Sequence, residues 1–239
     1  MARLNWDVLG ERFFETGIDR GVLYIDGQGV AWPGLISVAE SPTGGEAKPR
    51  YIDGYKYLNL AAAEEFEATI TAFFSPPEFA RCDGRAEIHP GLFATHQPRR
   101  TFDFSYRSKI GNDQNGTDHA YKIHLIYNAL AAPADRTYET LDDETEPMTH
   151  EWSITTRPPQ IFGYRPTSHF VIDSRTTPEA TLTTLEDILY GSAEGLPQIP
   201  TATSLIDIFA SGSVDLETIV YEGGDPSSVP TRFFDGGGV

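Results

Sequence analysis

The sequence predicts a mainly β protein, with a β-sandwich or barrel core, one flanking α-helix and long loops. Glycine and proline account for 22 and 17 of the 239 residues, which indicates many turns and short elements. Several segments alternate apolar and polar side chains with the period of two that a half-buried strand requires. A chain of this length can form one large β domain or two small ones, and it can bury a substantial core.

Short strands separated by Gly-containing turns are expected in the first part of the chain. Residues 22–32 are expected to form a hairpin around an Asp-Gly dipeptide, which favours a tight turn. A third short run covers residues 34–37. Residues 41–49 have loop composition from end to end, and another short strand is expected at 51–60.

Residues 65–74 are ambiguous, because Glu and Ala favour a helix whereas the apolar residues recur with a period of two. We interpret the segment as a strand, since Pro76 and Pro77 end it cleanly. Its apolar face would consist of Phe66, Ala68, Ile70, Ala72 and Phe74. A single helical turn is expected at 78–81.

The clearest element is a central antiparallel hairpin. Residues 101–107 and 121–128 both alternate apolar and polar side chains, with Ile126 as the one exception. Two half-buried strands joined by residues 111–118 explain both patterns.

Two more strands, at 150–156 and 168–173, are expected before a helix that ends at Gly191. The helix start is marked by a capping residue, a proline and an acidic residue: Thr177, Pro178 and Glu179. One apolar stripe follows, formed by Leu182, Leu185, Ile188 and Leu189. A shorter helical piece is expected at 204–209.

The chain is divided into three parts by composition. Residues 1–20 carry aromatic side chains among charges without a clear period, and we interpret them as an N-terminal arm that packs on something, such as a neighbouring chain. Residues 21–211 form the β-rich domain. Residues 212–239 are rich in Gly, Ser and Asp and are expected to be an extended C-terminal segment.

The charge of the chain limits its partners. Eighteen Lys and Arg against 35 Asp and Glu give a formal net charge of −17, so the chain should repel nucleic acid and anionic membranes. The single cysteine, Cys82, cannot form an intrachain disulfide and is expected to be a buried thiol. No signal peptide and no apolar run long enough to span a membrane are evident.

The loop at 111–118 is the strongest candidate for a site. It fails the EF-hand pattern, because Gly111 and Lys122 stand where acidic ligands are required. An irregular calcium site is an alternative, but a turn is the commoner use of such residues. We interpret the loop as a connection between two strands.

No pattern of catalytic or cofactor-binding residues is present. The six histidines lack metal-site spacing, and His119 and His124 would lie on opposite faces of a strand, so no metal site is expected. Carboxylates for glycosidase chemistry are plentiful, but no two are singled out. Phosphate-binding Gly loops and the G-x-S-x-G elbow are absent. We therefore expect no enzyme activity and no cofactor.

A series of eight segments, spread over roughly residues 10–210, is characteristic in order and composition. They are GVLY at 21–24, GVAWPGLISV at 29–38, SPTGGEA at 41–47, YLN at 57–59, IGND at 110–113, GTDHAYKIHLIY at 116–127, VIDS at 171–174 and LEDILYG at 185–191. In the order and composition of these segments, the chain resembles the major tail protein, or tail tube subunit, of long-tailed, non-contractile phages (siphoviruses).

The resemblance implies a structural virion protein. Such subunits have a β-sandwich or barrel core with a flanking helix, and they assemble into hexameric rings that stack into a hollow tube. The tube contacts other tail proteins and lets DNA pass into the host without specific binding. Family members have no catalytic residues, so none is carried over. The protein would be assembled in the host cytoplasm and reside in the phage tail.

In such a tube the loop at 111–118 is expected to contact a neighbouring subunit through Gly111, Asn112, Asp113, Asn115 and Asp118. Acidic side chains lining the tube would repel the DNA backbone over about 8–10 Å at physiological salt. Two other readings remain open. One is another virion β protein, such as a capsid decoration or baseplate component. The other is a carbohydrate-active enzyme, which would require a pocket with converging carboxylates.

Overall fold

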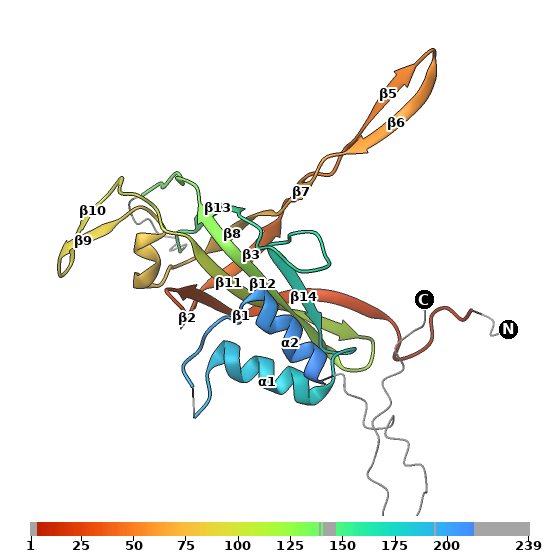
Figure 1. The fold of residues 1–239 in the computed structure, drawn as a ribbon. Coiled ribbons are helices and arrows are strands. Elements are labelled where there is room, and N and C mark those ends of the chain that lie inside the picture. The colour runs from red at the N-terminus through yellow and green to blue at the C-terminus, as the bar shows by residue number, and fades with distance from the viewer. Residues whose placement is uncertain (1–3, 139, 141–146, 194, 213–239) are drawn as a thin grey trace, which may run out of the picture.

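A computed structural model describes residues 4–138, 140, 147–193 and 195–212 of the chain. Its main sheet has eight strands in the order β2-β1-β11-β12-β13-β8-β3, with β14 also paired to β12 (Figure 1). These strands are β1 (Phe13–Ile25), β2 (Gln28–Ala31), β3 (Leu35–Glu40), β8 (Glu67–Ala72), β11 (Phe102–Asn112), β12 (Gly116–Ala131), β13 (His150–Thr156) and β14 (His169–Asp173). All pairings are antiparallel. The predicted mainly β fold is confirmed.

Three smaller strand pairs lie outside the main sheet. They are β4 (Thr43–Gly44) with β7 (Glu64–Glu65), β5 (Ala47–Ile52) with β6 (Tyr55–Ala61), and β9 (Ala86–His89) with β10 (Leu92–Ala94). The β5–β6 and β9–β10 hairpins project from the body of the molecule in different directions (Figure 1).

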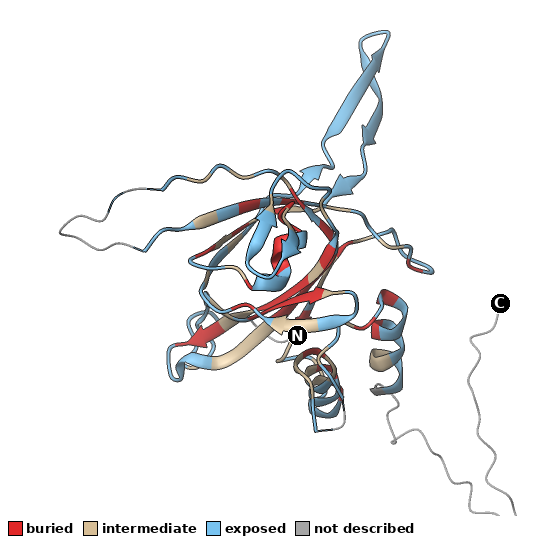
Figure 2. Ribbon diagram, turned by 90° about the vertical axis from the view of Figure 1, so that its left-hand side faces the viewer, coloured by how far each residue is buried: buried red, intermediate tan, exposed pale blue. Residues whose placement is uncertain are grey.

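The sheet curls around a hydrophobic core, so that strands from distant places in the sheet order share it (Figure 2). Leu23 of β1 and Ile70 of β8 belong to the same buried cluster, together with Trp32 and Trp152. A 3-10 helix at Pro77–Arg81, as expected for 78–81, adds the fully buried Phe79. The architecture is therefore closer to an open barrel than to two stacked sheets.

A second hydrophobic cluster lies between the outer face of this sheet and two helices, α1 (Glu179–Tyr190) and α2 (Ala202–Gly212). Its buried members come from β1, β12, β14 and the helices: Val22, Tyr24, Ile123, Leu125, Tyr127, Ile172, Leu185, Leu189 and Leu205. The hydroxyl of Tyr24 donates a hydrogen bond to the Leu189 carbonyl at 2.9 Å, which ties the sheet to α1.

The helical predictions differ from the structure in detail. α1 begins after Pro178, which is the N-cap, and Thr177 makes no capping bond to the first turn; its hydroxyl donates instead to the Asp173 carbonyl. Gly191, with φ of 85°, follows the helix end as expected. The second helical piece is a full helix, so two helices flank the sheet instead of one.

The strand predictions for the first part of the chain are partly wrong. The 22–32 hairpin is confirmed, with Asp26 and Gly27 at φ of 51° and 81° in its turn. The loop expected at 41–49 is wrong, because it contains β4 and the start of β5. The single strand expected at 51–60 is instead most of a hairpin whose turn is Asp53-Gly54.

The predicted three-part division stays a prediction. Strand β1 begins at Phe13 and runs across the position that separates the predicted arm from the domain. The predicted C-terminal segment lies outside the described residues, apart from Gly212 at the end of α2. Within the described ranges, no helix has the length and apolar character needed to cross a membrane.

Candidate functional site

The predicted contact loop is a tight turn between β11 and β12. Gly111 and Asn112 belong to β11, and Asn112 is buried with 4% of its surface exposed. Its side-chain Nδ2 donates to the Gly10 carbonyl at 3.0 Å, and its Oδ1 accepts from the backbone amides of Gln114 and Asn115. The Asn112 side chain therefore holds the turn together and binds the N-terminal segment to it.

The acidic residues of the turn also have partners within the chain. Asp113 accepts a hydrogen bond from the Gly10 amide at 2.9 Å, and Asp118 lies 3.6 Å from the Lys109 ammonium. These oxygens are therefore engaged in the fold of the protomer. The contact of this loop with a neighbouring subunit stays a prediction.

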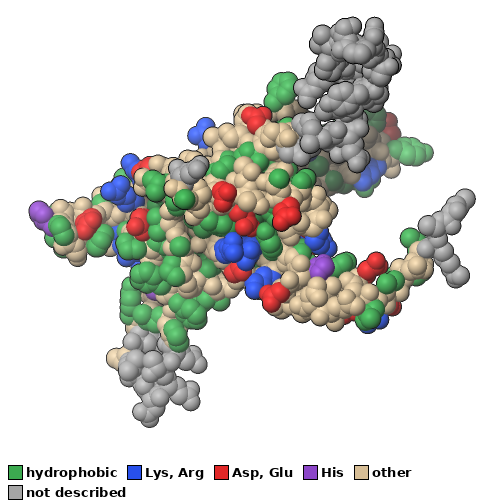
Figure 3. Space-filling model, turned by 90° about the horizontal axis from the view of Figure 1, so that it is seen from below, with side chains coloured by type: hydrophobic (Ala, Val, Ile, Leu, Met, Phe, Trp, Pro, Cys, Tyr) green, Lys and Arg blue, Asp and Glu red, His purple; other side chains and the backbone are tan. Residues whose placement is uncertain are grey.

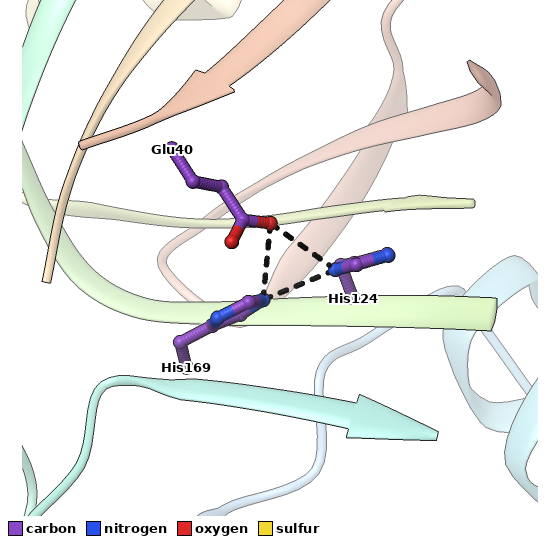
Figure 4. A group of neighbouring side chains, drawn as sticks. All are labelled: Glu40, His124 and His169. Carbon is purple, nitrogen blue, oxygen red and sulfur yellow. Dashed lines mark hydrogen bonds and ion pairs between the residues drawn. The ribbon is translucent and has the colours of Figure 1, made fainter. Parts of the chain in front are cut away.

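A different cluster, formed by Glu40, His124 and His169, brings together side chains with metal-ligand chemistry (Figure 4). Glu40 ends β3, His124 lies in the middle of β12 and His169 begins β14. His124 Nδ1 is 3.1 Å from His169 Nε2, and Glu40 Oε1 is 3.4 Å and 3.7 Å from these two atoms. This is the one such group of three or more His, Cys, Asp or Glu side chains among the described residues.

Neighbouring side chains orient the cluster. Tyr106 donates its hydroxyl proton to Glu40 Oε1 at 2.6 Å, and its ring stacks on that of His124 with 4.5 Å between centroids. Ser108 Oγ lies 2.9 Å from His124 Nε2, the ring nitrogen that faces away from the cluster. Phe66 packs against the His169 ring with 4.4 Å between centroids.

The environment keeps the cluster histidines neutral near pH 7. Burial, together with the neighbouring His169, lowers the pKa of His124 to about 4. Burial lowers the pKa of His169 too, and Glu40 opposes this shift. The pKa of Tyr106 is raised by burial and by its hydrogen bond to Glu40, so this phenol stays protonated. A neutral imidazole has one unprotonated ring nitrogen, and this nitrogen can bind a metal ion.

This cluster is not evident from the sequence, because its two histidines lie 45 residues apart. His124 and His169 are brought together by the antiparallel pairing of β12 with β14, in which His124 lies opposite Val171 and His169 opposite Ile126. The two histidines are therefore diagonal neighbours on one face of the sheet. Rules based on the spacing of residues in the sequence do not include the pairing of strands, and only this pairing reveals the cluster.

A buried carboxylate at the end of the barrel has a structural environment. Asp83, 8% exposed, accepts a hydrogen bond from Trp152 Nε1 at 3.2 Å and forms ion pairs with Arg85, Arg99 and Arg136. Three guanidinium groups surround this carboxylate, and their contacts join loops to the core.

The β5–β6 hairpin exposes every residue from 47 to 61 (Figure 2). Its large apolar side chains are Tyr51, Ile52, Tyr55, Tyr57, Leu58 and Leu60, with exposures between 45% and 80%. Isolated two-stranded hairpins are only marginally stable in water, so this hairpin gains from packing against something beyond its own protomer.

A shallow apolar groove of about 740 Å³ lies between β14, α2 and residues 161–167. Phe170, Ile206 and Phe209 are among its lining residues, which include Arg165 but no carboxylate among the described residues.

On the face seen from below, acidic and basic side chains are interspersed instead of separated into regions (Figure 3). One ion pair of the described residues joins Arg20 to Glu186 at 3.5 Å.

No protein-family model matches the sequence, and no curated protein matches it. Solved structures that match include a chain of the anti-feeding prophage baseplate, with 8% identity over 71% of this chain and 97% of that chain and a TM-score of 0.34. A chain of an extracellular contractile injection system sheath–tube complex in the extended state matches with 11% identity over 71% of this chain and 94% of that chain, at a TM-score of 0.32. A chain of the anti-feeding prophage tube-terminating cap matches with 11% identity over 73% and 96%, at a TM-score of 0.32.

Proposed function

We propose that this chain is a structural subunit of a phage-type tail, and that it self-assembles into stacked rings that form the tail tube. The observation that carries the proposal is the β5–β6 hairpin, which projects from the barrel with its apolar side chains uncovered. A monomeric protein has little reason to expose so many aromatic and aliphatic side chains on one extended arm. In a ring or tube, a neighbouring subunit would cover them.

The resemblance of the sequence to tail tube subunits supports the same proposal. Rings of six subunits, contacts with other tail proteins and passage of DNA through the bore come from that resemblance. The net charge of −17 favours a channel that DNA traverses without binding, since like charges repel at close range. The particle would be assembled in the host cytoplasm.

Electron microscopy and light scattering of the purified protein, over a wide range of concentrations, test the proposal. We expect rings or tubes with a central channel. Assemblies without a channel would point to a decoration or baseplate component. A wild-type protein that remains monomeric at every concentration would contradict the proposal.

Variants of the hairpin test the observation itself. Replacing Tyr55, Tyr57 and Leu58 together by Ser removes apolar surface that makes no core contact, so the monomer should keep its melting temperature but lose assembly. A matched control replaces Lys48 and Lys56 of the same hairpin by Gln and should assemble like the wild type. Normal tubes from the triple variant would show that the hairpin does not carry the assembly.

A further inference from the structure

We propose that Glu40, His124 and His169 bind one divalent transition metal ion, of which Zn²⁺ is the representative. Two imidazole nitrogens and one carboxylate oxygen form a ligand set suited to zinc and similar ions. The proposal concerns the folded protomer alone, and it holds whether or not the chain assembles into tubes.

The distances between the three ligand atoms match the size of such an ion. The separations of 3.1, 3.4 and 3.7 Å define a triangle whose corners can all be reached from one central point. That point lies about 2.0 Å from each atom, and zinc–nitrogen and zinc–oxygen bonds measure about 2.0–2.2 Å. A metal ion slightly out of the plane of the triangle would therefore contact all three atoms without movement of the strands.

The surroundings hold the ligands in a binding orientation. The contact between Ser108 Oγ and His124 Nε2 engages the outer ring nitrogen, which leaves Nδ1 directed at the other two ligands. The Tyr106 hydroxyl fixes the Glu40 carboxylate through a hydrogen bond. Partners of this kind around the ligands are a regular feature of protein metal sites, because they set ring orientation and ligand basicity.

The charge at the cluster also favours a cation. Within the described part of the chain, no Lys or Arg side chain forms an ion pair with Glu40, and the ring nitrogens of the two histidines lie 3.4 and 3.7 Å from its Oε1. Among the described residues, the Glu40 carboxylate therefore has no partner with a permanent positive charge. A divalent ion would supply the missing positive charge.

The position of the cluster lets an ion enter from solvent, and it lets a bound ion stabilise the fold. His169 and Phe66 line a groove of about 750 Å³ that opens to solvent, which gives an ion a path to the cluster from the His169 side. Glu40 ends β3, the last strand in the order of the main sheet, whereas the histidines belong to β12 and β14. The ion would therefore tie that strand to the centre of the sheet and stabilise the folded state.

Metal analysis of the untagged full-length chain tests the proposal. After removal of metals with a chelator, dialysis against Zn²⁺ and removal of excess, we expect one zinc per chain and a higher melting temperature than that of the metal-free protein. The histidine ring signals of His124 and His169 should shift in nuclear magnetic resonance spectra, whereas the other four should not. No bound zinc, or shifts confined to other histidines, would overturn the proposal.

Variants add an independent check. Glu40→Gln and His169→Gln should each lose the bound zinc and the rise in melting temperature. The control His150→Gln changes a histidine of β13 outside the cluster and should keep both. Retention of stoichiometric zinc by a double His124→Gln, His169→Gln variant would contradict the assignment. If a variant fails to fold, the wild-type stoichiometry and ring shifts still decide the question.

Discussion

Arg107 of β11 and Asp19 of β1 form a two-point ion pair across neighbouring strands. The guanidinium Nε and Nη2 atoms lie 2.7 and 2.8 Å from the two carboxylate oxygens. The same guanidinium lies over the ring of Tyr121, 4.4 Å from its centroid. The planar guanidinium makes two parallel hydrogen bonds to the carboxylate, which the ammonium group of a lysine cannot do. Because this geometry is specific, the contact fixes the register of the two strands.

The first prediction concerns the pH dependence of this ion pair. The hydrogen bond from Arg107 lowers the pKa of Asp19 below its ordinary value of 3.8. A depressed carboxyl pKa stabilises the fold above the unfolded-state value, and this contribution is lost as pH falls through the folded-state value. We expect Asp19→Asn to reduce the free energy of unfolding at pH 7 by about 1 kcal/mol, the scale for a partly exposed pair with good geometry.

Urea unfolding of both proteins at pH 7 and at strongly acidic pH measures this effect. The difference between wild type and Asp19→Asn should narrow as the pH falls below the ordinary value of Asp. Asp187→Asn, at an exposed position of α1, serves as the control and should show little difference at either pH. A gap for Asp19→Asn that is independent of pH would contradict the assigned cause.

The second prediction concerns the barrel core. The Phe79 ring is fully buried, with ring centroids at 4.8 Å from Trp32, 5.2 Å from Phe102 and 5.3 Å from Trp152. Phe79→Ala would leave a cavity among rigid aromatic rings and should cost about 3–5 kcal/mol of unfolding free energy. Phe162→Ala, at a fully exposed position, should cost close to nothing. Equal melting temperatures for the two variants would disprove the packing role of Phe79.

The third prediction concerns the attachment of the N-terminal segment. The Gly10 amide donates to the Asp113 carboxylate. A hydrogen bond to a charged acceptor contributes roughly 1.5 kcal/mol, so Asp113→Ala should let the Gly10 amide exchange about tenfold faster with deuterium. Asp118→Ala serves as the control in the same hairpin: the Asp118 carboxylate lies beside Lys109, so its loss should leave exchange of the Gly10 amide unchanged. Unaltered exchange in Asp113→Ala would indicate that other contacts hold this segment.

The sequence predicts those strands that bury one face and expose the other. Strand β8 alternates because one face of it packs into the barrel, as Ala68, Ile70 and Ala72 show by their burial. The β5–β6 hairpin has no buried face, so its alternation carries no information and its turn was assigned to a strand interior. Its apolar side chains, which include Tyr55, Tyr57 and Leu58, are all exposed, so the sequence pattern does not separate two short strands around Asp53-Gly54 from one strand.

The exception at Ile126 has a physical cause that the sequence does not reveal. Residues 123–127 of β12 are all buried, because one face of the strand lines the barrel and the other supports the helices. A positive φ of 51° at Asn128 and a register shift opposite Phe102–Phe104 accompany this stretch. A strand covered on both faces loses the period of two that identifies a half-buried strand.

Strand β12 contributes side chains to both hydrophobic clusters, with Ile126 in the barrel and Leu125 beneath the helices. If β12 leaves its place, both clusters lose buried surface at once, so the energetic penalties of opening them are coupled. The barrel and its helical cover should therefore melt as one cooperative unit, with a single transition and no stable half-open intermediate. Under mechanical load, a fold of this kind would yield all at once instead of losing its helices first.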